Sequence, residues 1–186
     1  MSAQELEALM GMLREQGAGL MSAEPVQARA DFEAMMAPIP LGSDARFEQT
    51  RLGSVPALKI TTAQSDAART LIYLHGGAYV IGSANAYRGL ASNLARAAGA
   101  VGYSLDYRLG PEVPFPGAVD DAVAAYRALL DQGRSPASIA VAGDSAGGGL
   151  AVAMLVAARR AGQVVPGHLL QAVGPQRRIL GHLGGE

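Results

Sequence analysis

The feature that most constrains the fold is a glycine-rich turn between an apolar strand and an apolar helix. Residues 143–147 read GDSAG, a G-x-S-x-G pentapeptide, and apolar runs lie on both sides of it. A serine at such a junction has a strained backbone, so Gly143 and Gly147 are expected to leave room for the turn and the helix. Ser145 Oγ should then stand at the carboxyl edge of a sheet, beside a helix N-terminus that favours negative charge. The alternative is a glycine-rich turn whose serine has no chemical role.

A second glycine-rich segment follows an earlier strand. The apolar residues 70–74 predict a buried strand, and the sequence continues HGGAYVIGS over residues 75–83. An acyl-transfer site needs two N–H donors at the oxygen that becomes an oxyanion. Ala146, which follows the serine, is one candidate, and Gly76 or Gly77 is the other. The alternative is a flexible loop, in which His75 hydrogen-bonds backbone and does not act as a base.

Strand and helix patterns alternate along most of the chain. Two N-terminal helices are followed by a hairpin over residues 47–61, and then by alternating strands and helices with short links. This order predicts a parallel sheet covered on both faces, with both glycine-rich loops at one edge. The predicted helices are 2–16, 22–36, 85–98, 117–132 and 146–161, and the predicted strands after the hairpin are 70–74, 100–105 and 138–142, with 168–173 a further candidate.

The chain is expected to form one domain with three regions. Residues 1–40 carry two helices with no strand between them, which is typical of an N-terminal helical cap, although a hairpin that only extends the core is the alternative. Residues 41–162 contain the α/β core, and residues 163–186 form a divergent tail. In the loop after the strand predicted at 100–105, Asp106 and Arg108 are expected to form a structural ion pair.

Composition removes several classes of function. The 186 residues carry a net charge of −1, which gives no reason to propose a nucleic-acid partner or a membrane surface. The absence of cysteine excludes disulfides and thiolate metal sites. The N-terminal residues lack the pattern of a signal peptide, and no run reaches the roughly 18 apolar residues of a membrane span. A cytoplasmic protein is the resulting expectation.

With both glycine-rich motifs and the proline-rich loop considered together, the chain resembles the hormone-sensitive-lipase-like esterases of the α/β-hydrolase superfamily. The order and spacing of the motifs fit that family from residue 1 to about residue 162. Ala78 stands where many members have a third glycine, but a backbone donor survives that change. The carrying segments are HGGAYVIGS (75–83), DYRLGPE (106–112), PFP (114–116) and GDSAGG (143–148).

The resemblance implies a fold, an activity and a set of site residues. The fold would be an α/β-hydrolase-type, mostly parallel sheet with flanking helices and an N-terminal cap. Ser145 would be the nucleophile that forms an acyl-enzyme from short-chain carboxylic esters or lactones, without a metal or organic cofactor. Asp144, next to it, would be structural. The oxyanion hole would be formed by the N–H groups of Gly76, Gly77 and Ala146.

The last part of the chain departs from the family. In this superfamily an aspartate or glutamate and then a histidine follow the serine, but after Ser145 the chain offers no aspartate and only Glu186 as a glutamate. The histidines His168 and His182 are expected to be exposed, so no triad acid or histidine is identifiable. The hypothesis is a truncated reading frame, with a frameshift near residues 163–167 as one route, that lacks the C-terminal part of the fold.

Truncation would have two consequences. The chain alone is expected to be weakly active or inactive, and to self-associate through an unfinished sheet edge. The alternatives to an ester hydrolase are a non-catalytic protein that binds small molecules on the same fold and an inactive fragment.

Overall fold

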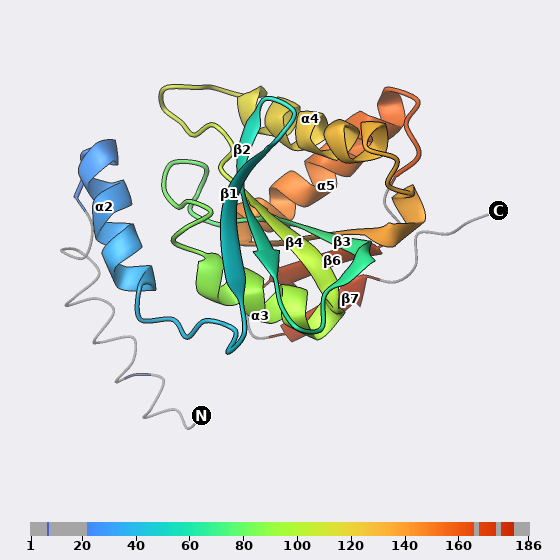
Figure 1. The fold of residues 1–186 in the computed structure, drawn as a ribbon. Coiled ribbons are helices and arrows are strands. Elements are labelled where there is room, and N and C mark those ends of the chain that lie inside the picture. The colour runs from blue at the N-terminus through green and yellow to red at the C-terminus, as the bar shows by residue number, and fades with distance from the viewer. Residues whose placement is uncertain (1–6, 8–21, 166–167, 174–175, 181–186) are drawn as a thin grey trace.

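The computed structural model describes residues 7, 22–165, 168–173 and 176–180. These residues form one mixed sheet with helices on both faces (Figure 1). The strands lie in the order β1-β2-β4-β3-β5-β6-β7. They are β1 (Arg46–Leu52), β2 (Val55–Thr61), β3 (Asp66–Leu74), β4 (Ala100–Leu105), β5 (Ile139–Asp144), β6 (His168–Val173) and β7 (Gln176–Leu180). The helices are α2 (Pro25–Met36), α3 (Arg88–Ala98), α4 (Gly117–Asp131) and α5 (Ser145–Arg160), with a 3-10 turn η1 at Pro136–Ser138.

The predicted parallel sheet is confirmed at its centre. β4, β3, β5 and β6 run parallel, whereas β1, β2 and β7 pair antiparallel to their neighbours. The predicted hairpin is also confirmed: Leu52 pairs with Val55 across a two-residue turn, and Gly53 has a φ of 60° that suits glycine. The predicted helix over residues 2–16 lies outside the described residues, apart from Glu7.

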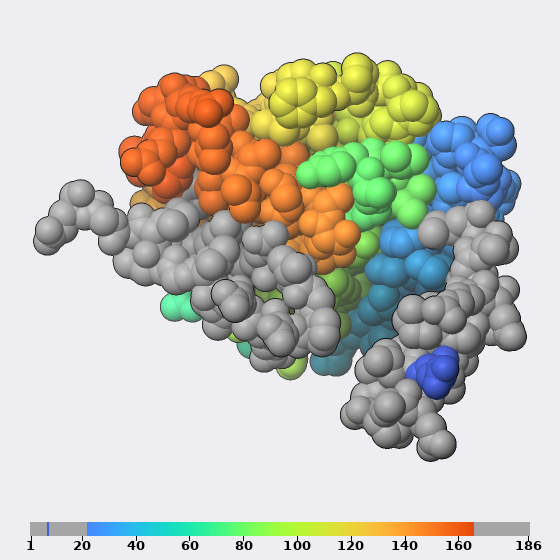
Figure 2. Space-filling model, turned by 180° about the vertical axis from the view of Figure 1, so that it is seen from behind, coloured from blue at the N-terminus to red at the C-terminus, as the bar shows by residue number. Residues whose placement is uncertain are grey.

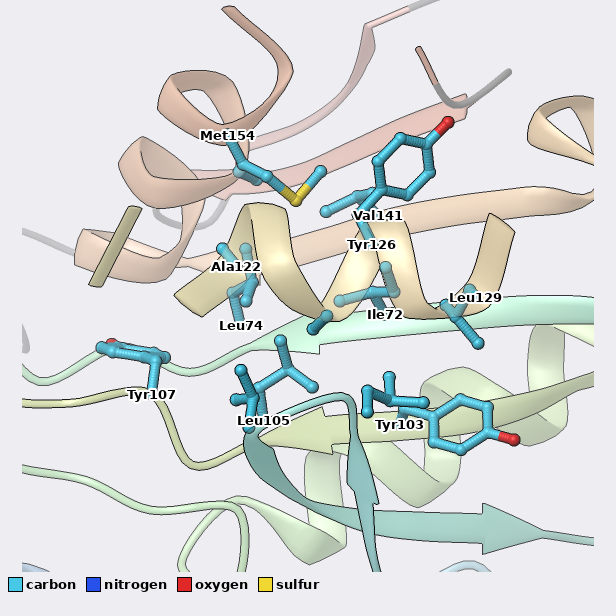
Figure 3. Close-up of a cluster of buried hydrophobic side chains, with 14 of the residues drawn as sticks. Ile72, Leu74, Tyr103, Leu105, Tyr107, Ala122, Tyr126, Leu129, Val141 and Met154 are labelled. Carbon is cyan, nitrogen blue, oxygen red and sulfur yellow. The ribbon is translucent and has the colours of Figure 1, made fainter. Parts of the chain in front are cut away.

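Two hydrophobic clusters hold the layers together. On one face α4 and α5 pack against the sheet, and Figure 3 shows Tyr126, Leu129 and Met154 among the strand residues Ile72 and Val141. On the other face α3 packs against β2 and β4, together with Phe32 of α2. Each fully buried residue of this size contributes about 1.5–3 kcal/mol of hydrophobic stabilisation.

The spacing of the larger apolar residues in α4 predicts a buried face of Val119, Val123, Tyr126, Leu129 and Leu130, and the structure confirms it only in part. Tyr126 and Leu129 are buried as predicted, but Val119, Val123 and Leu130 are only partly buried. Alanines take the positions nearest the sheet and α5, because their small side chains allow a close approach of the backbones. The fully buried alanines of α4 are Ala122 and Ala125.

Several element boundaries differ from the prediction; the strand predicted at 70–74, for example, begins at Asp66. The helix predicted from residue 85 begins at Arg88, after a turn, and ends as predicted at Gly99, which adopts a left-handed φ of 59°. The strand candidate at 168–173 is confirmed as β6. A further strand, β7, pairs with β6 over residues 176–180 and was not among the predicted strands. The charged pair Arg177–Arg178 gave no strand signal.

The sheet changes direction of winding between β3 and β5. β3 leads to α3 on one face, whereas β5, its neighbour, leads to α5 on the other face. Leu74, the last residue of β3, pairs with Gly143 of β5, so the two following segments leave the sheet side by side. In α/β sheets such a place, at the carboxyl ends of neighbouring strands, is where ligands bind.

Candidate active site

Ser145 lies at the junction that the sequence singled out. β5 ends at Asp144 and α5 begins at Ser145 with no residue between them. The serine is exposed and has a φ of 48°, in the left-handed region that side-chain-bearing residues rarely adopt. A backbone conformation of this kind costs on the order of 1–3 kcal/mol and persists only where the surroundings impose it.

The two glycines of the pentapeptide provide the space that this turn needs. A Cβ atom on Gly147 would overlap the backbone carbonyl of Leu74, at the end of the neighbouring strand. A Cβ atom on Gly143 would overlap the backbone of Gly147. The close packing of α5 against the end of β3 therefore requires glycine at both positions.

The first turn of α5 presents free backbone donors. The N–H groups at a helix N-terminus have no intrahelical acceptor, and a side chain at the preceding position usually caps them. Asp144 occupies that position but makes no capping hydrogen bond. The N–H of Ala146 is therefore left for another acceptor, at the end of the helix that favours negative charge.

The carboxylate of Asp144 is turned toward the loop after β3. Its Oδ1 accepts hydrogen bonds from the Tyr73 hydroxyl at 2.7 Å and from the Gly76 N–H at 2.9 Å, and its Oδ2 accepts one from the Tyr87 hydroxyl at 3.2 Å. Burial, and then the Asp144 charge, raise the pKa of both tyrosines, which keeps them as donors. The sequence predicted a structural Asp144 but did not identify Tyr73 and Tyr87 as its partners.

The contact with Asp144 changes the set of candidate oxyanion donors. The N–H of Gly76, one of the predicted donors, is already engaged by the carboxylate. The N–H groups of Gly77 and Ala78 donate to no acceptor within the described residues. The candidate donors in this loop are thus Gly77, as predicted, and Ala78, which stands in the position of the family's third glycine.

Two bound carbonyls fix the direction of these donors. The carbonyl oxygen of Gly76 lies 2.7 Å from Nδ1 of His75, and that of Gly77 accepts the N–H groups of Val80 and Ile81, both at 2.9 Å. In a planar trans peptide the C=O and the following N–H point in opposite directions. Holding the two carbonyls therefore directs the N–H groups of Gly77 and Ala78 away from the body of the loop.

His75 makes the predicted hydrogen bond to backbone. Its side chain is buried between the rings of Tyr107 and Tyr87, with centroid distances of 4.3 and 5.6 Å. Burial lowers the pKa of the imidazole, which is therefore neutral near pH 7. Because the Gly76 oxygen can only accept, Nδ1 carries the proton, and Nε2 has no partner within the described residues. No contact joins this imidazole to Ser145, so it is not placed as its base.

The predicted ion pair in the loop after β4 has a different partner. Arg108 pairs at 2.7 Å with Asp121 of α4, which also accepts the Arg108 N–H at 2.8 Å. Asp106 instead accepts the N–H of Ala84 at 2.6 Å. The prediction that Asp106 and Arg108 pair with each other was wrong, because each has another partner: Arg108 pairs with a carboxylate of α4, and Asp106 accepts a backbone N–H of the loop after β3.

The described residues add neither a candidate triad base nor a metal site. His182 and Glu186 lie outside the described residues, and so does the side chain of His168. Within the described part, no cluster of three or more His, Cys, Asp or Glu side chains is placed to hold a metal ion. The same part contains no helix with the length and apolar character needed to cross a bilayer.

Comparison with known proteins decides the family. A family model described as the alpha/beta hydrolase fold matches residues 71–177, which is more than half of the chain. The chain belongs to the alpha/beta hydrolase fold family. The matched segment of this alpha/beta hydrolase begins within β3 and includes both glycine-rich loops and Ser145.

Relatives of this alpha/beta hydrolase include named ester hydrolases. An acetyl-hydrolase of Streptomyces hygroscopicus is 54% identical over 115 residues, which cover 62% of this chain and 38% of that protein. An ethyl acetate hydrolase of Pseudomonas putida is 46% identical over 89 residues, 46% of this chain and 28% of that protein. The chain spans well under half the length of these curated relatives.

Solved structures confirm the fold and the resemblance. The crystal structure of an esterase from the bacterial hormone-sensitive lipase family superposes with a TM-score of 0.81 at 43% identity. That alignment covers 92% of this chain and 57% of the other. A hormone-sensitive lipase from a metagenome library gives a TM-score of 0.82 at 38% identity, with the same two shares covered. The likeness to hormone-sensitive-lipase-like esterases predicted from the motifs is thus confirmed.

Proposed function

We propose that this chain carries the nucleophile and the oxyanion-binding part of a serine carboxylic ester hydrolase. One observation carries the proposal: Ser145 has a left-handed backbone at the start of α5, and the loop directed by His75 offers free N–H groups beside it. The names of the relatives, acetyl-hydrolase and ethyl acetate hydrolase, support short-chain carboxylic esters as substrates. Lactones share the same reacting group.

The proposed chemistry follows the geometry. Ser145 Oγ attacks the ester carbonyl carbon, and the carbonyl oxygen becomes an oxyanion that accepts hydrogen bonds from the N–H groups of Ala146, Gly77 and Ala78. Collapse of this intermediate expels the alkoxide, which leaves as the alcohol after taking up the proton that the Ser145 hydroxyl has lost. The acyl group remains on Ser145, and water then releases the acid. Among the described side chains no base contacts Ser145, so these residues supply the nucleophile and the charge stabilisation but not the proton acceptor.

A non-catalytic binding role is the second candidate. The observation that favours it is that no base among the described side chains contacts Ser145. In that case the N–H groups of Gly77 and Ala146 would bind the carbonyl oxygen of a small ester-like ligand without turnover.

One experiment separates the two candidates. The purified chain and Ser145→Ala are incubated with p-nitrophenyl acetate and with a fluorophosphonate probe, and circular dichroism checks that both are folded. Hydrolysis and labelling that both depend on Ser145 support the hydrolase. Labelling without hydrolysis indicates a site that lacks its base. A folded protein that shows neither reaction contradicts the hydrolase and favours binding alone.

A further inference from the structure

Arg29 of α2 contacts both loops that flank the candidate site. Its Nε donates to the carbonyl oxygen of Val80 at 2.8 Å, and its Nη2 donates to that of Gly110 at 2.8 Å. Nη1 and Nη2 also donate to the two carboxylate oxygens of Glu112, at 3.0 and 2.7 Å. One guanidinium therefore joins α2 to the loop after β3 and to the loop after β4.

A single backbone hydrogen bond links Val80, which Arg29 contacts, to the peptide that carries the candidate donor Ala78. The N–H of Val80 donates to the carbonyl oxygen of Gly77, which belongs to the same planar peptide as the Ala78 N–H. The carbonyl oxygen of Tyr79 accepts the Gly110 N–H at 2.7 Å. The turn over residues 77–81 is thus held from within at Gly77 and from outside by Arg29 and Gly110.

This turn needs outside support because its backbone is strained. Ala78 and Tyr79 have φ angles of 54° and 62°, two consecutive left-handed residues that are not glycine. Each such conformation costs on the order of 1–3 kcal/mol and is kept only by surrounding contacts. Arg29 supplies contacts at the C-terminal end of the strained pair, directly at Val80 and through Gly110 at Tyr79.

The position of α2 fits this role. Figure 2 shows the green surface of the loop after β3 between the orange surface of α5 and the blue surface of α2. Glu33, one helical turn after Arg29, accepts hydrogen bonds from the Ser83 hydroxyl and from Asn85 Nδ2, the latter at 3.1 Å. Phe32 between them packs on Tyr87 with a centroid distance of 5.7 Å. α2 therefore contacts the loop in its middle, at Val80, and near its C-terminal end.

We propose that Arg29 is a positioning residue that holds the turn over residues 77–81 in the conformation that binds an oxyanion. The inference rests on the proposed function of this loop. Among side chains only a guanidinium can make all of these contacts, because two carbonyls and a carboxylate in different directions need a planar group with several fixed donors. Lys at this position would keep the charge near Glu112 but would not reach both loops.

The test uses the purified chain and four variants. Arg29→Ala and Arg29→Lys remove the bridge, Glu112→Gln removes the ion pair but keeps the two carbonyl contacts, and Arg96→Ala removes a comparable ion pair, to Asp44 at 3.0 Å, on α3. Two quantities are measured. The first is the amide hydrogen exchange of Val80 and Ile81, whose N–H groups are hydrogen-bonded within the turn. The second is the rate of covalent labelling of Ser145 by a fluorophosphonate at saturating probe, separated from the reversible affinity for the probe.

The inference predicts a specific pattern. Both Arg29 variants should slow the covalent step roughly tenfold, because a small displacement of aligned groups is costly in rate. Exchange of the turn amides should accelerate by a similar factor, while Glu112→Gln and Arg96→Ala stay close to the parent chain. The inference is overturned if Glu112→Gln matches Arg29→Ala, if Arg29→Lys matches the parent, or if exchange of the turn is unchanged.

The two measurements separate this inference from the proposed function. If the parent chain is not labelled at Ser145 but Arg29→Ala accelerates exchange of the turn, then Arg29 holds the loop and the hydrolase proposal fails. If Ser145 is labelled and the exchange is the same in Arg29→Ala, the hydrolase proposal stands and the role of Arg29 is contradicted.

Discussion

Gly76 donates its backbone N–H to the carboxylate of Asp144 at 2.9 Å, so the residue before the proposed nucleophile anchors the loop after β3. The loop and the nucleophile turn follow neighbouring parallel strands, and this hydrogen bond joins them directly. The space between them is closed: a Cβ atom on Gly76 would overlap the same carboxylate. Asp144 thereby sets the distance between the serine and its candidate oxyanion donors.

Removing this carboxylate should destabilise the fold as well as the site. In Asp144→Ala the buried Tyr73 hydroxyl and the Gly76 N–H both lose their acceptor, and we expect the free energy of unfolding to fall by about 2–4 kcal/mol. Asp144→Asn keeps an acceptor oxygen and should lose less. Urea denaturation measures both, with Asp131→Ala, an exposed helical position, as the control. Equal stability of Asp144→Ala and the control would disprove the anchoring role.

Substitution by alanine should change the stability of the fold very differently at two glycines of α5. In Gly147→Ala the new methyl group overlaps the carbonyl of Leu74, which is backbone and cannot move aside, so we expect a loss of more than about 3 kcal/mol or failure to fold. In Gly149→Ala the nearest atom is the end of the Tyr79 side chain at 3.1 Å, and helix propensity should offset the contact, with a change within about 1 kcal/mol. Thermal unfolding compares the two variants, and similar melting temperatures would refute the packing described at Gly147.

His75 should make the fold sensitive to mild acid. Burial lowers the pKa of its imidazole in the folded chain below the ordinary value of 6.5, so the unfolded chain binds a proton first as the pH falls. Stability from the neutral ring is therefore complete above about pH 6.5 and is lost as the pH falls through the folded pKa. We expect the free energy of unfolding to decrease between pH 7 and pH 5, and to decrease less in His75→Gln. Parallel pH curves for the two proteins would contradict this.

The motifs predicted the site because the residues of each motif lie close together in the sequence. The strand, turn and helix around Ser145 and the strand that leads to His75 are each contained in a few consecutive residues, and the alternation of elements was enough to bring them to one edge of the sheet. The left-handed backbone of Ser145 follows from the same local pattern.

Long-range partners could not be predicted in this way. Arg108 pairs with Asp121, 13 positions further on, and Gly76 donates to Asp144, 68 positions further on, so sequence neighbours gave the wrong ion pair and left the engagement of Gly76 unseen. No local pattern identifies Arg29 as important, because its contacts are with loops more than 50 residues away.

The most direct test of the account is the rate at which a fluorophosphonate modifies Ser145 compared with an exposed serine of the same chain. Ser54, in the β1–β2 turn, is exposed and does not lie at the N-terminus of a helix, so it provides the internal reference. Peptide mass spectrometry over a time course gives both rates in one sample. The account predicts that Ser145 is modified at least about tenfold faster than Ser54. Equal rates in a folded chain would contradict it.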